Sequence, residues 1–565
     1  MPLTFAGHHW SGRVRMPMRV WLGVAWLGVA WLGAVACAEV GDKTAVIAVG
    51  GDADAVIPLL WTQTQGRVVT ELMFDKLAEI GPALSTVGDA GYQPRLASSW
   101  TWSRDSLSIA FHLDPAARWH DGRAVTARDV RFAFQVYTDP KAAAVGGRDI
   151  AANIDSVSIG DSLTATVWFK ARTPEQFHSV AYNLIALPEH LMGAIAHDSL
   201  RQSAFASLPV GNGPFRFAGW DKSKSLELIA NDAYSRGRPK LKRIVFLITN
   251  PQAAVRAVLA GDADFFERFS LDDLAEAARS PDIKVTPSPQ FAYAVLEFNL
   301  RSTDGRQPHP LLASAGVRRA LTMAVDRVAL ERNVLDSLGT PAIGPFSRAQ
   351  WTSDTTLRQI AYDTTAANRL LDSLGWTRGS DGTRARGGQR LAFGIVVSSS
   401  SRPLVRYAEL LQQAFARVGV KVAVELGDQK ALVDRVTAHT FDAALLTWNG
   451  TPSPSGVRQL WGSKSIAKTG TQNAGSWSNA TFDAHVDSGL AALSIAAAKA
   501  HFKVAYQAAV DDAPAVWLFE PMLVPGVSKR LVTGPMRADA WWQSIPAWDV
   551  TGPPRHGAAT PTKKP

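Results

Sequence analysis

The 565-residue chain contains a single cysteine, Cys37. One thiol excludes an intramolecular disulfide and a zinc site built from several thiolates. The sequence also lacks a Walker A loop, a G-x-G-x-x-G fingerprint, a G-x-S-x-G nucleophile elbow and an H-E-x-x-H pair. No segment repeats with a period of about 20–50 residues, which argues against a solenoid or a propeller. No motif of these kinds therefore indicates a metal, a cofactor or a catalytic centre.

Charge of one sign is also scarce. The formal net charge is +9, and Arg13, Arg15 and Arg19 account for three of those positives. Lysine and arginine are otherwise scattered among acidic residues, which argues against nucleic-acid binding. Apolar residues are plentiful at 46%, with 23 Phe and 19 Trp. A chain of this length and composition forms roughly two to four globular domains.

The longest apolar run lies near the N-terminus. Basic residues at 13–19 precede an uncharged run of 17 residues, 20–36, and the small residues Ala34 and Ala36 stand just before Cys37. This order is typical of an export signal. A membrane-spanning helix is the alternative, but the run is at the short limit for crossing a bilayer. Its end resembles a bacterial lipobox with alanine at the usual leucine position, which implies that Cys37 is lipid-modified.

The rest of the chain mixes strand and helix patterns. A strand is predicted over 43–60 and a helix over 66–81, and residues 96–115 read as a hairpin. Residues 311–335 show the spacing of one long amphipathic helix, and 390–426 read as strand, helix and strand, which predicts a parallel pair. The fold class is therefore α/β with α+β parts, in several domains.

Two short motifs invite a catalytic interpretation. His120 and Asp121 are adjacent at a predicted turn between a strand and a helix, with no third polar group nearby, so a corner of the fold explains them better than a catalytic pair or half a metal site. Residues 160–163 spell GDSL, the name motif of a serine esterase family. No histidine here has an aspartate three residues before it, and a hairpin turn explains the segment.

Tryptophan is the remaining signal. Trp61, Trp448, Trp461 and Trp477 fall near predicted strand ends or loops. Aromatic side chains there can wall a cleft and stack on a ligand, whereas most tryptophans in a chain of this size belong to the core. Both interpretations stay open at this point.

One family resemblance covers residues 45–545. The stretch 96–137 resembles the signature region of the family 5 extracellular solute-binding proteins, the oligopeptide-, dipeptide- and nickel-binding components of ABC importers. Further blocks match in the same order: LPVGNGPFRFAGW, AVLAGDADFF, GVRRALTMAVDR and FDAALLTWNG.

The resemblance implies a two-lobed, type II periplasmic-binding-protein-like fold with an extra domain inserted in lobe I. The expected division is a lipoprotein-type signal peptide at 1–37, lobe I at 38–83, 209–300 and 521–552, the extra domain at 84–208, lobe II at 301–520, and a disordered tail at 553–565.

The resemblance also implies a function. The protein is expected to capture a peptide-like or other small solute between closing lobes and deliver it to an ABC permease in the cytoplasmic membrane. It would act as a lipid-anchored monomer in the periplasm or on the outer face of that membrane, without cofactor, nucleic acid or catalysis. A secreted hydrolase with a glycosidase-type carboxylate pair, or a non-transport lipoprotein adaptor on the same fold, is the alternative.

Ligand-binding residues follow by analogy with the family: Trp61, Phe291, Tyr293, Trp448, Asn449, Thr451, Trp477 and Asn479. In peptide-binding members, the segment matching 448–451 carries an aspartate that pairs with the peptide α-amino group. Thr451 stands there in this chain, with Asp442 as the first alternative acid. The departure predicts ligands without a free amine, such as a blocked or cyclic peptide or an oligosaccharide.

Overall fold

The computed structural model describes residues 43–336, 338–466 and 472–552. The predicted export signal, Cys37 and the tail at 553–565 lie outside the described residues. Among the described residues, no helix combines the length and apolar character that a membrane crossing requires.

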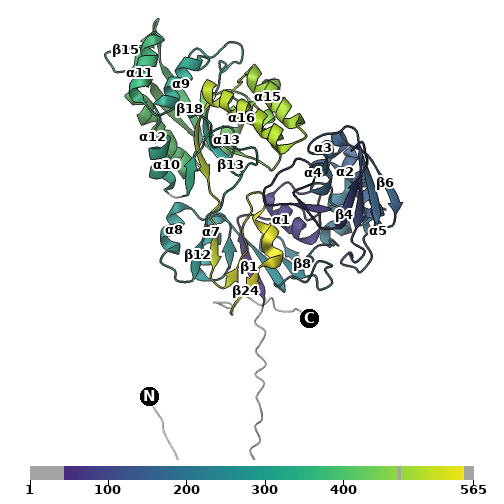
Figure 1. Cartoon of the computed structure of the whole chain (residues 1–565). Coiled ribbons are helices and arrows are strands. Elements are labelled where there is room, and N and C mark those ends of the chain that lie inside the picture. Colours follow the sequence, from purple (N-terminus) through teal and green to yellow (C-terminus); the bar gives the residue numbers. More distant parts are fainter. Residues whose placement is uncertain (1–42, 337, 467–471, 553–565) are drawn as a thin grey trace, which may run out of the picture. The chain divides into compact units, whose positions relative to one another are not determined.

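A seven-stranded first sheet gathers strands from distant parts of the chain (Figure 1). Its order is β12 (Ile283–Val285), β22 (Gly526–Ser528), β11 (Phe265–Phe266), β1 (Thr44–Val49), β10 (Arg243–Ile248), β9 (Ser225–Ala230) and β8 (Phe215–Asp221). The side chains of β1 alternate between two cores. Ala45 and Ile47 pack with α1 (Thr64–Met73), and Val46 and Ala48 pack with α7 (Pro251–Ala260). A further helix, α8 (Leu271–Ala277), precedes β12.

A six-stranded second sheet is built from the second half of the chain. Its order is β14 (Gly339–Pro341), β21 (Ala515–Pro521), β13 (Ala292–Phe298), β20 (Ala443–Asn449), β18 (Ala392–Ser398) and β19 (Lys421–Gly427). The predicted strand–helix–strand unit is confirmed, because β18 and β19 pair in parallel and α12 joins them. The helices of this part are α9 (Ala315–Met323), α10 (Arg327–Leu335), α11 (Thr364–Ser373), α12 (Arg402–Arg417), α13 (Gln429–Thr437), α14 (Ser455–Trp461), α15 (Ala480–Ala491) and α16 (Ile495–Asp512).

A four-stranded sheet occupies the chain between β1 and β8, in the order β4 (Ala97–Trp102), β5 (Ser108–Leu113), β7 (Thr164–Phe169) and β6 (Ile154–Asp161). β4 and β5 form the predicted hairpin, and the GDSL segment is the turn between β6 and β7. The core that contains Ile47 continues into this sheet. Its helices are α2 (Ala127–Thr138), α3 (Gly147–Asn153), α4 (Gln176–Ala181), α5 (Glu189–Met192) and α6 (Ala204–Ser207).

Short elements complete the described chain. The two-stranded sheets are β2 (Ala78–Ile80) with β3 (Tyr92–Pro94) and β23 (Leu531–Val532) with β24 (Asp549–Val550), and a three-stranded sheet holds β15 (Thr377–Arg378), β16 (Arg384–Arg386) and β17 (Gln389–Arg390). The 3-10 helices are Pro140–Ala142, His197–Gln202, Ser463–Ser465 and Trp541–Ala547.

Two predicted helices differ from the structure. The helix expected over 66–81 ends at Met73, and the amide of Asp75 is held instead by the side chain of Asn212 at 2.9 Å. The single helix expected over 311–335 is two helices, α9 and α10. Asp326 starts the second one by accepting a hydrogen bond from the Ala329 amide at 3.0 Å, which is the usual role of an N-cap.

The lobe boundary expected at residue 300 also needs correction. The sequence placed β13 in lobe I, but β13 pairs along its whole length with β20 and also with β21, so it belongs to the second sheet. The chain thus leaves the first sheet after β12 and crosses at 286–291. It returns at 522–525, and the two crossings pair through Ser288 and Leu523, whose amides donate to each other's carbonyls at 2.9 and 2.8 Å.

Candidate functional site

The carboxyl end of β20 meets the first crossing. Trp448 is half-buried there, whereas Asn449 and Thr451 are exposed. The amide of Gly450 donates to the carbonyl oxygen of Phe291 at 2.6 Å, and the Phe291 ring itself is buried. Four of the residues predicted from the sequence therefore lie together, with polar and aromatic groups at the point where the chain passes between the sheets.

The buried acid Glu297 orients the indole ring of Trp448. Its indole Nε1 donates to Glu297 Oε2 at 3.1 Å, and the Gly475 amide donates to Glu297 Oε1 at 2.7 Å. Burial raises the pKa of Glu297 to about 7, against the effect of these two hydrogen bonds. The arrangement fixes the plane of the Trp448 ring. Sequence reasoning missed Glu297, although a lone acid inside the apolar run of β13 was the available signal.

The β20–α14 loop, residues 450–454, is held from two sides. Gln350 Nε2 and Trp351 Nε1 donate to the Pro452 carbonyl at 2.7 and 3.1 Å. On the other side, Ser453 Oγ donates to Glu175 Oε2 at 2.8 Å. Glu175 belongs to the part of the chain that carries the four-stranded sheet, so the loop contacts two separate parts of the protein. No local sequence signal marks this contact.

Trp61 lies on a different element, next to the start of α1. Its ring is half-buried, and the guanidinium of Arg67 lies 5.8 Å from the ring centroid. Its indole Nε1 is buried and lacks a hydrogen-bond partner among the described residues. An unpaired buried donor is uncommon, and a ligand or water acceptor would satisfy it.

Three predicted residues have structural roles instead. Tyr293 is 4% exposed and its hydroxyl accepts a hydrogen bond from Trp461 Nε1 at 2.9 Å. Trp477 is 1% exposed and donates to Asp512 Oδ2 at 2.6 Å. Asn479 caps α15 by accepting from the Phe482 amide at 3.0 Å. Aromatic residues near strand ends give the same sequence pattern whether they face the core or a cleft, so the sequence could not separate the two.

Asp442 cannot replace the acid that is missing at position 451. It precedes β20, whereas Thr451 follows it, and a seven-residue strand spans about 20 Å. Asp442 is also engaged, since it accepts hydrogen bonds from His309 Nε2 at 3.1 Å and the Gly394 amide at 2.8 Å.

The pair His120 and Asp121 forms a structural corner, in agreement with the sequence interpretation. His120 Nε2 donates to the Gly213 carbonyl and Nδ1 accepts from the Gly211 amide, both at 3.1 Å. These bonds require the neutral ring, and burial lowers its pKa to about 4. Asp121 contacts His190 instead, at 2.7 Å. Within the described ranges, no three His, Cys, Asp or Glu side chains gather as a metal site.

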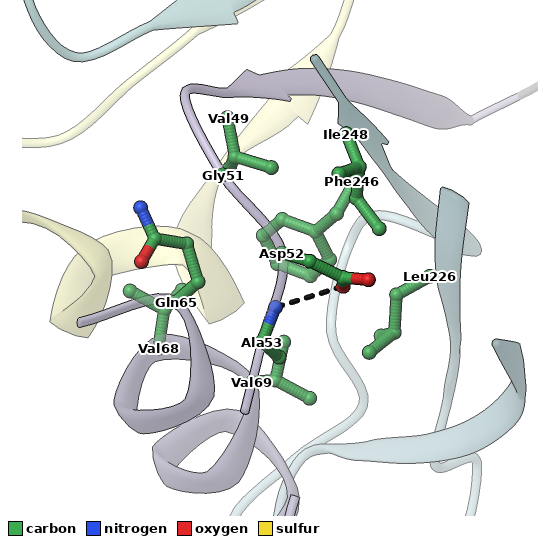
Figure 2. Close-up of a pocket in the computed structure, with 10 residues that line it drawn as sticks. All are labelled: Val49, Gly51, Asp52, Ala53, Gln65, Val68, Val69, Leu226, Phe246 and Ile248. Atoms are coloured by element: carbon green, nitrogen blue, oxygen red, sulfur yellow. Dashed lines mark hydrogen bonds between the residues drawn. The ribbon is translucent and has the colours of Figure 1, made fainter. Parts of the chain in front are cut away.

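A small hollow opens at the carboxyl ends of β1 and β10 (Figure 2). Its wall is largely apolar and none of the residues predicted from the sequence lines it; the lining residues are Val49, Gly51, Asp52, Ala53, Gln65, Val68, Val69, Leu226, Phe246 and Ile248. Asp52 is the one acid of this lining. Its carboxylate accepts hydrogen bonds from the Ala53 amide at 2.8 Å and from Trp220 Nε1 at 2.9 Å, so it is already engaged.

Two sheets joined by paired crossings, with exposed polar groups beside one crossing, are the arrangement of a two-lobed protein. Residues 91–469 match the family described as bacterial extracellular solute-binding proteins, family 5 Middle, and this range is more than half of the chain. The chain belongs to the family 5 bacterial extracellular solute-binding proteins. It has their two-lobed, type II periplasmic-binding-protein fold.

Known proteins support this assignment. The chain is 27% identical over 353 residues to the oligopeptide-binding protein AppA of Bacillus subtilis, covering 61% of this chain and 63% of AppA, which is less than two thirds of that relative. It is 26% identical over 426 residues to heme-binding protein A of Haemophilus influenzae, covering 70% of this chain and 73% of the other.

Among solved structures, NikZ from Campylobacter jejuni in complex with Ni(L-His) has a TM-score of 0.73 at 22% identity, covering 90% of this chain and 99% of NikZ. CtaP from Listeria monocytogenes has a TM-score of 0.78 at 19% identity, covering 91% of this chain and all of CtaP. At these identities the structural likeness concerns the fold.

Proposed function

We propose that the protein is the extracytoplasmic solute-binding component of an ABC importer. It captures a peptide-like or other small solute between two closing lobes and delivers it to a membrane permease. The observation that carries this proposal is the position of the β20 end, whose exposed groups lie beside one of the two crossings on which closure would turn. The names of relatives, which include oligopeptide-binding and heme-binding proteins, support a peptide-like or other small solute.

The sheets support a division into three parts. Lobe I comprises 43–83, 209–291 and 522–552 around the first sheet, lobe II comprises 292–521 around the second sheet, and the extra domain at 84–208 carries the four-stranded sheet. In the part of the chain that the structure describes, two short crossings join the lobes, which suits a hinge. A ligand that contacts both lobes only when they are closed shifts the equilibrium towards closure, without making or breaking a bond.

The ligand contacts we propose are Trp61 on lobe I and Trp448, Asn449 and Thr451 on lobe II. Trp61 offers an unpaired indole N–H, and Trp448 offers a ring whose plane is fixed by Glu297. Phe291 contributes by holding Gly450 through its carbonyl group. The buried Tyr293 and Trp477 and the helix cap Asn479 are not part of the site we propose.

Mass spectrometry of the native protein tests the proposal. The protein released from its cells should carry a small solute of unchanged structure. Adding that solute back to the emptied protein should alter tryptophan fluorescence and reduce the radius of gyration in solution scattering. A tightly bound solute that changes neither signal would contradict closure, and conversion of the solute to a product would favour the hydrolase alternative.

Cys37 carries a second part of the proposal, the lipid anchor. The single cysteine follows the apolar run at 20–36, so cleavage after Ala36 would make it the first residue of the mature chain. The substitution Cys37→Ala should abolish fatty-acid labelling and release the protein from membranes. Membrane retention equal to that of the wild type would contradict the anchor while leaving solute binding intact.

A further inference from the structure

Glu175 connects the extra domain to the loop that carries the site. Its Oε2 accepts the hydrogen bond from Ser453 Oγ at 2.8 Å, and its Oε1 accepts one from Thr86 Oγ1. Ser453 Oγ also lies 2.9 Å from Ser455 Oγ, which can donate to it, so the loop and the start of α14 are organised around the same hydroxyl group. Thr451, where the family resemblance implies an acid in peptide-binding members, stands two positions before Ser453 in this loop.

The carboxylate of Glu175 has no cationic partner among the ion pairs of the described residues. Burial raises its pKa, and the only groups that counter this are the neutral hydroxyls of Thr86 and Ser453. Glu520 provides a contrast in lobe II, because this buried acid pairs with Arg348 at 2.5 Å, whereas the half-buried Glu175 has no such partner among the described residues. Glu175 therefore has unused acceptor capacity, since an ionised carboxylate offers about four lone-pair positions.

The place of this unpaired charge matters for closure. Thr86 lies in the extra domain with Glu175, whereas Ser453 belongs to lobe II, so the Ser453 contact exists only while the loop lies against the extra domain. Forming that contact removes water from a carboxylate, which disfavours the closed arrangement unless a positive charge arrives with it. A cationic ligand group would supply that charge, and a neutral one would not.

We propose that Glu175 selects a cationic group of the ligand, an ammonium or a guanidinium, at the contact between the extra domain and the β20–α14 loop. The inference rests on the proposed function and narrows its ligand class to solutes that carry a free amine or a similar cation. It reverses the expectation drawn from Thr451, because the acid is supplied from the opposite side of the loop rather than from position 451 or from Asp442.

Matched peptides test the assignment. Calorimetric titration of the full chain with trialanine to pentaalanine, each compared with its N-acetylated form, measures the preference for the free amine. The wild type should bind the free-amine forms at least about 10-fold more tightly, and Glu175→Gln should reduce that ratio to less than about 2-fold. The neutral side chain keeps the size of the residue and an oxygen for one hydroxyl group.

The control is Glu189→Gln, which removes one negative charge from the same domain. Glu189 forms an ion pair with the exposed Arg128 at 2.7 Å and lies outside the loop contact, so the free-amine preference should be unchanged. A preference that persists in Glu175→Gln, or falls equally in Glu189→Gln, would overturn the inference. If Glu175→Gln does not fold, Glu175→Asp withdraws the charge by one methylene and should still lower the ratio.

The outcomes also separate this inference from the function on which it rests. Equal binding of free and acetylated peptides by the wild type would reject Glu175 as a selector while supporting a peptide-like ligand. Binding of neither form would reject the peptide-like ligand, and the inference with it.

Discussion

Two buried glutamates have pKa values displaced in opposite directions. Glu71 on α1 is 7% exposed and Glu297 on β13 is 1% exposed. Burial raises the pKa of both, but at Glu71 the nearby cations Arg67 and Lys76 more than offset it and hold the value at about 2. At Glu297 the donors are an indole and a backbone amide, and the value is about 7. Equal burial thus has opposite consequences, according to whether a cation is present.

The two acids lie in different regions of the molecule, Glu71 on α1 and Glu297 on β13, in contact with Trp448 near the end of β20. Around α1, Arg67 donates to Glu71 Oε1 at 2.7 Å and Lys76 Nζ lies 3.2 Å from Oε2, while Trp542 from the C-terminal segment donates at 3.0 Å. Glu71 thus binds two nearby cations and, through Trp542, a distant segment of lobe I. Near the β20 end, Glu297 and Glu175 have only neutral donors. The acid near α1 therefore has cationic partners, whereas the two acids near the β20 end have neutral ones.

The largest effect is expected from Glu71→Gln, which neutralises the acid that has cationic partners. Removing the acid of a buried ion cluster deprives Arg67 and Lys76 of their nearest counter-charge, and the free energy of unfolding should fall by about 3–5 kcal/mol. Chemical denaturation followed by circular dichroism measures it. Glu425→Gln is the matched change at a half-exposed pair with Arg435 and should cost less than about 1 kcal/mol. Similar losses in both variants would contradict the scaffold role.

The next effect concerns pH and reverses in sign between the two acids. The folded pKa of Glu297 lies above its unfolded value of 4.5, so its contribution to stability is complete below pH 4.5 and is lost as pH rises through about 7. The loss amounts to roughly 3 kcal/mol. The contribution of Glu71 instead is complete above pH 4.5 and is lost as pH falls towards about 2.

Glu297→Gln isolates the first of these terms. The difference in unfolding free energy between wild type and variant should move against the wild type by roughly 3 kcal/mol from pH 4.5 to pH 7.5. All other titrating groups are common to both proteins and cancel in the difference. The amide can accept only one of the two hydrogen bonds, so the variant is expected to be the less stable protein at pH 4.5. A pH-independent difference would show that Glu297 titrates normally.

Local patterns determined which parts of the fold could be predicted. The parallel pair β18 and β19 was predicted because its strand, helix and return strand are contiguous in sequence. The boundary at β13 was missed because a fully buried strand looks alike in either lobe. Only its pairing with β20 and β21, about 150 and 220 positions later, decides the sheet. Helix ends failed for a similar reason, since Asn212 holds the chain just after α1.

The site was predictable only in part. Trp448, Asn449 and Thr451 were identified through the family resemblance, and they do lie together at the end of β20. The direction of a side chain was not predictable, so the buried Tyr293 and Trp477 were included. The contact between Glu175 and Ser453 joins residues 278 positions apart, and no local pattern encodes such a pair.

A smaller effect is expected from Trp448→Phe, which removes one of the two hydrogen-bond donors to Glu297. The lost hydrogen bond should cost about 0.5–1.5 kcal/mol, and the pKa of Glu297 should rise further because only the Gly475 amide then stabilises its charge. The pH midpoint of the stability profile measures the second change. Trp548→Phe loses an indole bond to Ser544 in lobe I and should leave that midpoint unchanged. Equal midpoints in all three proteins would disconnect Trp448 from Glu297.

The smallest effect on stability is expected from Thr451→Asp, which adds an acid to the region of unpaired acids, but on the surface. Thr451 is exposed and its hydroxyl makes one long hydrogen bond, to the Ser453 carbonyl at 3.3 Å, so the free energy of unfolding should change by less than about 0.5 kcal/mol.

The effect of Thr451→Asp on ligand binding should be larger than its effect on stability. If the loop faces the ligand as proposed, a carboxylate at position 451 gives an ammonium group a charged acceptor where the hydroxyl gave only a neutral one, and charge-assisted hydrogen bonds are roughly twice as strong. The affinity for free-amine peptides should therefore rise while that for N-acetylated peptides stays the same, as calorimetry on matched pairs would measure. Because Glu175 lies beside the same loop, the gain should be larger in the Glu175→Gln background, where no other acid accepts the cation. An equal gain for acetylated peptides, or none in either background, would show that position 451 does not face the ligand.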